Sequence, residues 1–192
     1  RIKMYQEIYN QEDTVYCVYS GHGLYLDPLS PDPIGYLAKN GNANGINCEH
    51  TFPQSKGADQ GNARSDMHHL FPSRAAVNEA RSNFPFSEIE DRKTQTWFFK
   101  NVGINTIPNT NIELYSESTS FSFEPREDHK GNAARAVFYF MSMYDLQADK
   151  SFFESMRATL CDWHESDPVD SLEWTRSHLI ANYQEDKANP FV

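Results

Sequence analysis

The sequence predicts an α+β protein, and three observations lead to this fold class. Runs of β-branched and aromatic residues, which favour strands, lie in the first half of the chain. Apolar residues at helical spacing dominate the second half, so the fold should be mostly helical. Between them, residues 46–84 read as two extended segments followed by a helix. At 192 residues the chain can bury a substantial core, and we expect a single domain.

The first forty-five residues predict one helix, one strand and a long loop. Residues 1–10 carry apolar side chains at helical spacing, which indicates a short amphipathic helix. Residues 14–19 are β-branched and aromatic and predict a strand. Residues 27–45 are rich in Pro, Gly, Asn and Asp, which favours a loop without a regular element.

The middle segment predicts two strands and a helix. A short strand is expected at 46–50 and a second extended segment at 65–71, ending at Pro72. Ser73 is a suitable N-cap for a helix over 74–83. Together these elements predict a compact unit that can bind a metal ion.

Side-chain spacing within this unit predicts which residues face which way. Arg74, Asn78 and Arg81 are separated by four and three residues, so the helix should present them on one polar, basic face. Glu49 and His50 are neighbours on a strand, where successive side chains point to opposite faces. Either the strand ends there or a pocket wraps its edge, and the spacing leaves both arrangements open.

The remaining elements follow the same two periodicities. An aromatic run at 94–99 predicts a strand or a buried turn, and the run at 112–115 is strand-like. Helices are expected at 133–147 and 151–163 from their apolar stripes. Asp167 followed by Pro168 predicts the N-terminus of a last helix that extends to about residue 183.

The charge of the chain limits how it could engage nucleic acid. With 17 basic and 27 acidic side chains, the formal net charge is −10, which argues against tight coating of DNA. Residues 50–93, however, hold six basic and six acidic side chains, so this segment is neutral. Local complementarity is sufficient for an enzyme that must release its product.

Composition also bears on whether the protein is membrane-bound or secreted. No run of eighteen apolar residues occurs, so no membrane span is expected. The chain begins at Arg1 without a charged and then apolar leader, so we expect that any signal peptide has been removed. A Cys17–Cys48 disulfide with Cys161 unpaired is one interpretation of the three cysteines, and three free thiols are the other.

Three residues of the middle segment carry groups that suit metal-assisted hydrolysis. His50 can accept a proton from water as a neutral imidazole. Glu49 and Asn78 offer hard oxygen atoms, and Mg²⁺ commonly uses one or two such protein ligands together with waters and phosphate. The alternative is that His50 is a structural histidine and that the pattern is incidental.

Several motifs together resemble the endonuclease I family. They are NCEHTFPQS at 47–55, SDMHHLFP at 65–72, VNEARSN at 77–83, GNAARAVFYF at 131–140, and the spaced pattern from Asp167 to Phe191. The similarity extends from about residue 45 to the end of the chain. The resemblance implies a nonspecific nuclease of the ββα-metal (His-Me finger) class, with its core at about 46–84 and a helical part at about 132–185.

The resemblance also implies a site and a cofactor. By position, His50 would be the general base, and Glu49 and Asn78 would bind one Mg²⁺ ion, with Ca²⁺ or Mn²⁺ as alternatives. An arginine would hold the scissile phosphate, with Arg64 the first candidate and Arg81 the second. Asp66 and His68 fit the pattern as residues that orient the second strand or the metal-binding side chains by hydrogen bonding.

For substrate and location, the resemblance implies a secreted or periplasmic monomer that does not bind membranes. DNA, together with RNA, would be cut to 5′-phosphate and 3′-hydroxyl ends through contacts to phosphate and sugar. Two other classes of protein compete with this hypothesis. One is a zinc hydrolase or zinc module using Cys48, His50, His68 and His69, and the other is a non-catalytic extracellular binding module.

Overall fold

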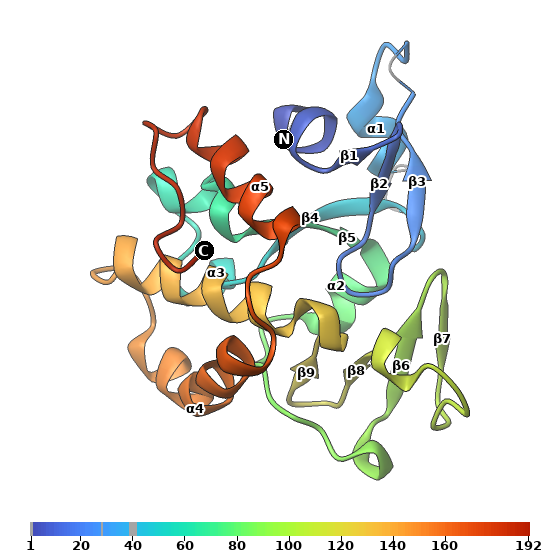
Figure 1. Cartoon of the computed structure of the whole chain (residues 1–192). Coiled ribbons are helices and arrows are strands. Elements are labelled where there is room, and N and C mark those ends of the chain that lie inside the picture. The colour runs from blue at the N-terminus through green and yellow to red at the C-terminus, as the bar shows by residue number, and fades with distance from the viewer. Residues whose placement is uncertain (1, 28, 39–41) are drawn as a thin grey trace.

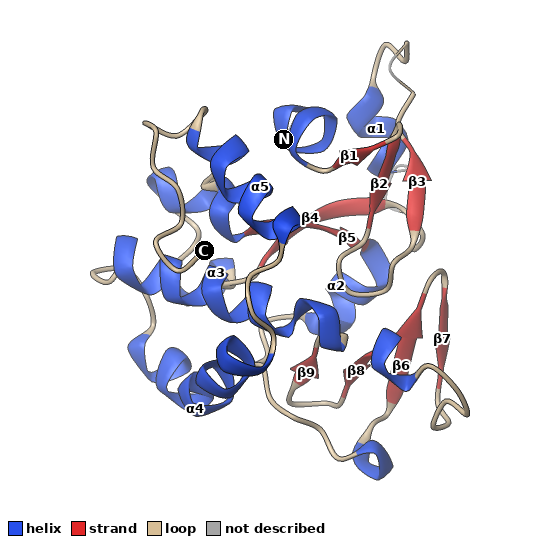
Figure 2. Ribbon diagram, viewed as in Figure 1, coloured by secondary structure: helices blue, strands red, loops and turns tan. Residues whose placement is uncertain are grey.

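The computed structural model describes residues 2–27, 29–38 and 42–192. The protein is α+β, as predicted. Its longest helices, α3 (Lys130–Met143), α4 (Lys150–Ser166) and α5 (Ser171–Ala181), lie on one side of the molecule. The strands of the first and last sheets lie on the other side, and β4 and β5 run between the two parts (Figures 1 and 2).

The N-terminal region begins with a short helical turn and a small sheet. The turn covers Met4–Ile8, inside the predicted helix. Strands β1 (Asn10–Gln11), β2 (Thr14–Tyr16) and β3 (Gly23–Tyr25) form an antiparallel sheet in that order. The predicted strand at 14–19 is therefore shorter than expected, and β3 was not predicted.

The prediction of an irregular loop over 27–45 is wrong in part, because α1 covers Pro33–Ala38. Pro33 occupies the first helical position, where its missing N–H costs nothing. Asp32 Oδ1 accepts a hydrogen bond of 2.9 Å from the backbone N of Gly35, which caps the helix. Part of this predicted loop, residues 28 and 39–41, lies outside the described residues.

The central unit consists of two antiparallel strands and a helix. β4 (Ile46–His50) pairs with β5 (Leu70–Arg74) so that His50 lies opposite Leu70, and α2 (Ala75–Arg81) follows directly. The strand at 46–50 is confirmed. The second strand starts later than predicted, because Asp66 caps a helical turn over Met67–His69.

The position of Pro72 inside β5 corrects the expectation that the strand ends there. The carbonyl of Pro72 accepts a hydrogen bond of 3.0 Å from the backbone N of Val18. Because the N and C=O of one strand residue point to the same edge, the Pro72 nitrogen also faces away from β4. The strand therefore tolerates proline without losing a bond of the β4–β5 ladder.

The predicted N-cap of the following helix is also wrong. Ser73 is buried within β5, and Arg74 occupies the N-cap position without a side-chain cap. The first helical N–H groups are instead satisfied by the preceding loop, since Ala75 N donates to Gly45 O at 2.8 Å and Ala76 N to Ala43 O at 3.1 Å. The loop before β4 therefore fixes the start of α2.

A second sheet follows the central unit. Its strands are β6 (Thr96–Phe99), β7 (Val102–Ile104), β8 (Ser116–Ser118) and β9 (Phe123–Glu124), in the order β7-β6-β8-β9. β6 confirms the strand predicted from the aromatic run. The strand-like run at 112–115 instead contains a helical turn.

The predicted helices of the C-terminal half are present with shifted ends. α3 starts three residues earlier than expected, and Asp167 Oδ2 accepts a hydrogen bond of 2.8 Å from the backbone N of Gly131 near its start. Asp167 therefore does not cap the last helix. Asp170 does so, accepting a hydrogen bond of 2.7 Å from Glu173 N.

Helices α3 and α5 hold the central unit in place. Phe52, just after β4, stacks on Phe140 of α3 with 4.2 Å between ring centroids. Arg176 of α5 donates to the carbonyls of Met67 (2.7 Å), His68 (3.1 Å) and Leu70 (3.4 Å). A buried guanidinium with three carbonyl partners fixes the backbone where β5 begins.

Candidate functional site

His50 lies at the end of β4 with its ring oriented by a backbone carbonyl. Its Nε2 is 3.0 Å from Arg64 O, which can only accept a hydrogen bond. In the neutral ring Nε2 must therefore carry the proton, and Nδ1 presents its lone pair. The side-chain nitrogen of Gln54 lies 3.4 Å from Nδ1 and is placed to donate to it. The arrangement holds the imidazole in the tautomer that a general base needs.

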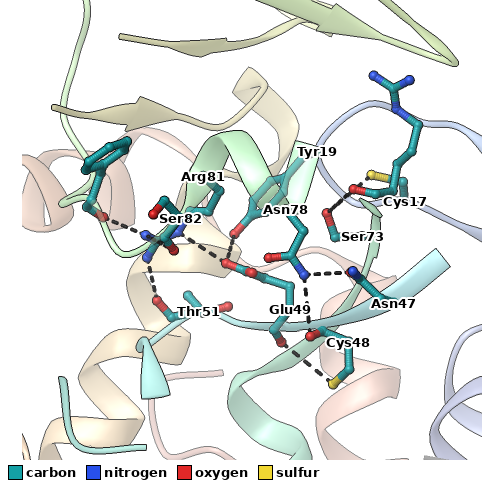
Figure 3. A network of polar contacts seen from close by, with 12 residues as sticks. Cys17, Tyr19, Asn47, Cys48, Glu49, Thr51, Ser73, Asn78, Arg81 and Ser82 are labelled. Atoms are coloured by element: carbon teal, nitrogen blue, oxygen red, sulfur yellow. Dashed lines mark hydrogen bonds and ion pairs between the residues drawn. The ribbon is translucent and has the colours of Figure 1, made fainter. Parts of the chain in front are cut away.

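Glu49 points to the opposite face of β4 and is almost completely buried. Its Oε1 accepts a hydrogen bond of 3.1 Å from the Tyr19 hydroxyl and lies 3.2 Å from Arg81 Nε (Figure 3). Burial raises the pKa of Glu49 to about 7, although Arg81 and Tyr19 favour the ionised form. A second positive charge next to this carboxylate would lower its pKa.

Asn78 reaches from α2 to β4 next to Glu49. Its Nδ2 donates to Asn47 Oδ1 at 2.6 Å and makes a longer contact of 3.5 Å with Cys48 O (Figure 3). Because the nitrogen is directed toward the strand, the amide oxygen Oδ1 is left for another partner. A buried carboxylate that one arginine does not fully compensate, together with this amide oxygen, is a donor set that fits a hard cation such as Mg²⁺.

Arg64 ends a helical turn, Gly61–Arg64, that two histidines hold by its carbonyls. His50 Nε2 contacts Arg64 O, and His69 Nε2 contacts Ala63 O at 2.6 Å. The Arg64 side chain is exposed and lines the same cavity as His50. The backbone of this turn is therefore fixed next to the imidazole, while the guanidinium extends into solvent.

Asp66 is the centre of a buried hydrogen-bond network. Oδ2 accepts from the hydroxyls of Tyr139 (2.9 Å) and Tyr144 (2.6 Å), and Oδ1 accepts from Gln184 Nε2 (2.7 Å) and His68 N (3.0 Å). Burial opposes ionisation, but these hydrogen bonds outweigh it and hold the pKa of Asp66 below its usual value. The carboxylate thus ties helix α3 and the C-terminal segment to the start of β5.

His68 and His69 are engaged by backbone carbonyls. His68 Nε2 contacts Lys187 O at 2.8 Å, and burial lowers its pKa. Burial also lowers the pKa of His69, to about 4. Among the described residues no three His, Cys, Asp or Glu side chains converge on one point. These contacts do not assemble the cluster that the zinc hypothesis requires.

The basic helix face predicted for α2 is not exposed. Arg81 is fully buried and donates to Phe84 O (2.6 Å) and Thr51 O (2.9 Å), in addition to its contact with Glu49. Arg74 is also buried, and its Nη1 donates to Asn101 O at 2.8 Å. Both guanidinium groups bind the protein itself, whereas Arg64 is exposed.

The Cys17–Cys48 disulfide is not formed, and all three cysteines are free thiols. Cys17 Sγ lies 3.8 Å from Ser73 Oγ, while Cys48 Sγ lies 3.9 Å from Met4 Sδ. Cys48 lies opposite Pro72 of β5, so the side chains of these two residues share one face of the hairpin. Ser73 is the next residue and points to the other face, where Cys17 contacts it. Because Cys17 and Cys48 are on opposite faces, they do not form a disulfide even though both lie close to β4 and β5.

Two residues of the site were missed by sequence reasoning. Gln54 follows His50 by four residues, and the turn after Pro53 brings it back to the imidazole. Its position inside the NCEHTFPQS motif was the available signal. Tyr19 precedes Glu49 by thirty residues, and no local pattern indicates their contact.

The fold and the site define an α+β protein built on a ββα unit, in which a strand presents adjacent carboxylate and imidazole groups and the helix supplies a carboxamide. The chain belongs to the Endonuclease I family, whose sequence profile matches residues 3–192.

Two curated relatives carry the name extracellular ribonuclease. The protein from Bacillus subtilis (strain 168) is 30% identical over 191 residues, and that from Bacillus amyloliquefaciens is 29% identical over 190 residues. Each alignment covers 86% of this chain and 60% of the relative, so the chain spans about 60% of their length. Within the described residues, none of the helices is long and apolar enough to cross a bilayer.

Proposed function

We propose that this protein is a metal-dependent endonuclease that hydrolyses phosphodiester bonds of DNA and RNA with little sequence preference. His50 would act as the general base, and Glu49 and Asn78 would hold one Mg²⁺-type ion. The proposal is carried by one observation: the Arg64 carbonyl fixes the proton on Nε2 of His50, next to the buried Glu49. Family membership supports the reaction class.

The chemistry follows from the orientation of the imidazole. His50 Nδ1 takes a proton from a water molecule, whose oxygen attacks phosphorus as the bond to the 3′ oxygen breaks. The departing 3′ oxygen takes up a proton from solvent water, and His50 returns its proton to solvent, which leaves 5′-phosphate and 3′-hydroxyl ends. Because β4 ends at His50, a phosphate at the strand end could be reached from both faces, and a divalent cation held by Glu49 and Asn78 would supply charge stabilisation for the phosphate and the leaving oxygen. The Arg64 carbonyl keeps the ring from rotating away, and Gln54 holds Nδ1 until the attacking water takes its place.

Arg64 supplies the positive charge that the substrate requires. Its side chain is exposed and its backbone carbonyl is bonded to His50, so the cation is anchored next to the proposed base. A guanidinium can bind two phosphate oxygens in one plane. The contacts are to phosphate and do not read base edges, which accounts for weak sequence preference.

Substrate and location are inferred from the relatives. Both are named extracellular ribonucleases, which supports RNA as a substrate and a secreted or periplasmic location for this protein. We propose that DNA is cut as well, since a site that contacts phosphate does not require the 2′-hydroxyl. The chain would act as one nuclease domain and as a monomer.

The test compares metals and one variant on plasmid DNA and on RNA. We expect degradation with Mg²⁺, none in EDTA, and loss of activity in His50→Ala. Activity with zinc alone would favour a zinc hydrolase instead. Inertness with every metal, combined with retained binding of nucleic acid, would favour a non-catalytic binding module.

The ion can be tested apart from activity. Isothermal titration of Mn²⁺ into the wild type should give one site. Glu49→Gln and Asn78→Ala should weaken that binding, because the first removes the negative charge of the carboxylate and the second removes the amide oxygen. Arg64→Ala serves as a control that should leave Mn²⁺ affinity unchanged. Equal affinity in all four proteins would contradict the proposed ligands.

A further inference from the structure

A cavity of about 530 Å³ opens on the face of β4 that carries His50. His50 and Arg64 lie in its lining, while Glu49 points away from it to the opposite face. Helix α3 contributes Met143, and the C-terminal segment contributes Tyr183. The volume is within the range of pockets that bind small organic groups. The cavity therefore extends from the proposed base toward the helical side of the molecule.

The cavity wall is held in position by the Asp66 network. Tyr139, Tyr144 and Gln184 line the cavity, and their polar ends are all tied to the carboxylate of Asp66. Because the hydroxyl groups are engaged there, these tyrosines cannot turn freely. A wall whose side chains are fixed before binding loses little conformational entropy when a ligand enters.

The rim combines apolar surface with positive charge. Tyr183 and Met143 are 45% and 46% exposed, so both offer faces that a planar ring can cover. Lys3, Arg64 and Lys187 also line the cavity. The two lysines form ion pairs with exposed glutamates, and such pairs are weak enough to be exchanged for phosphate.

We propose that this cavity holds one unpaired nucleotide of the substrate, next to the phosphate that His50 and Arg64 address. This inference rests on the proposed function and adds a preference to it: single-stranded DNA or RNA, or a single-stranded region, is bound more tightly than a duplex. A base inside a duplex is stacked and paired, so it must be extruded at a free-energy cost before it can enter the cavity. Aromatic faces beside a cationic rim bind the bases of single strands without regard to sequence.

The test is equilibrium binding in EDTA, where no cleavage is expected. Fluorescence anisotropy is measured with a labelled single-stranded octanucleotide and with a hairpin duplex, each as DNA and as RNA. For Tyr183→Ala we expect about 5- to 100-fold weaker binding of single strands, the loss typical of one stacked base. Duplex affinity should change less than twofold.

Matched variants separate the ring from other effects. Tyr183→Phe should keep wild-type affinity because stacking needs only the ring. Tyr25→Ala removes a tyrosine of β3 that is also about half exposed and lies outside the cavity. If Tyr183→Ala does not fold, Met143→Glu places a negative charge at the same rim and should weaken single-strand binding, whereas Leu146→Glu, outside the cavity, should not.

The results are decisive in both directions. Equal weakening of single strands and duplex, unchanged single-strand affinity in Tyr183→Ala and Met143→Glu, or no binding of the octanucleotide by the wild type would overturn the assignment. Failure of the proposed function is seen separately, as absence of Mg²⁺-dependent cleavage. A protein that cleaves but treats single strands and duplex alike in all variants refutes the cavity proposal alone.

Discussion

The two faces of β4 differ in how their polar groups are satisfied. On one face Glu49 is enclosed by Tyr19 and Arg81, and nearly all of its surface is hidden from water. On the other face His50 borders a cavity and is held by a carbonyl and an amide. A single strand thus supplies a buried carboxylate and, from the next residue, the proposed base at the wall of a cavity, because its side chains alternate.

The comparison predicts that removing the His50 imidazole lowers the rate of hydrolysis and leaves the stability of the fold largely unchanged. His50→Ala should lower kcat/KM by about 10²- to 10⁴-fold, the usual contribution of a general base, with little change in unfolding temperature. Hydrolysis of a fluorogenic oligonucleotide with Mg²⁺ measures the rate. His178→Ala, at an exposed histidine of α5, is the control and should retain full activity. Similar rates in both variants would exclude His50 as the base.

On the face of β4 that carries Glu49, removing the ion-pair partner Arg81 should lower the stability of the fold. Arg81→Met leaves the Glu49 carboxylate buried without its cation, which typically costs about 3–5 kcal/mol of unfolding free energy. Urea denaturation measures the loss. The double variant Arg81→Met with Glu49→Gln should recover part of it, because the unpaired charge is gone. Strictly additive losses would mean that the two groups are not coupled.

Acid should destabilise the protein through histidines that are buried in the neutral form. Burial lowers the pKa of His69 to about 4, from about 6.5 in the unfolded chain. Below pH 6.5 the unfolded state binds a proton that the folded state does not, so stability falls as pH drops toward 4. The His69 contribution at pH 5 is about 2 kcal/mol.

The pH effect is isolated by a difference between variants. Carboxylates with raised pKa values, including Glu117 and Glu124 at about 7, change stability in the opposite direction over part of this range. We therefore compare the loss of stability from pH 7 to pH 5 in the wild type and in His69→Gln, where it should be smaller by that amount. His178→Gln should behave as the wild type, and an unchanged loss in His69→Gln would refute the assignment.

The smallest expected effect concerns Gln54. Its contact with Nδ1 is long, so Gln54→Ala should lower kcat only about two- to fivefold, which corresponds to about 0.5–1 kcal/mol. KM should stay unchanged, because the amide acts on the orientation of the base. Gln60→Ala, also exposed and on the same connection between β4 and β5, is the matched control. An equal change in both variants would indicate a general effect of the loop.

Local sequence pattern was sufficient to predict much of the fold. The strands at 46–50 and 96–99 and the C-terminal helices follow from residue type and periodicity, and the structure confirms them. Their ends were predicted less well where a cap competes with propensity. Asp66 starts a helical turn inside an apparent strand, and Asp167 caps α3 instead of the helix that follows it.

The candidate site was predictable as a set of residues but not as an arrangement. The motifs single out Glu49, His50 and Asn78, yet they do not indicate that Tyr19 and Arg81 enclose the carboxylate. Such contacts join segments far apart in the sequence and depend on how sheets and helices pack. The free cysteines have the same origin, since only the hairpin register places Cys17 and Cys48 on different faces.

The contacts of Arg176 limit how far this protein can be shortened. The ββα unit contains every group proposed to take part in phosphodiester cleavage, but the backbone at the start of its second strand is held by a guanidinium more than one hundred residues downstream. A peptide cut from the central unit would keep the proposed catalytic residues but lose the contacts of Arg176 that hold their backbone in place. Engineering should therefore retain α5 or replace its anchoring role.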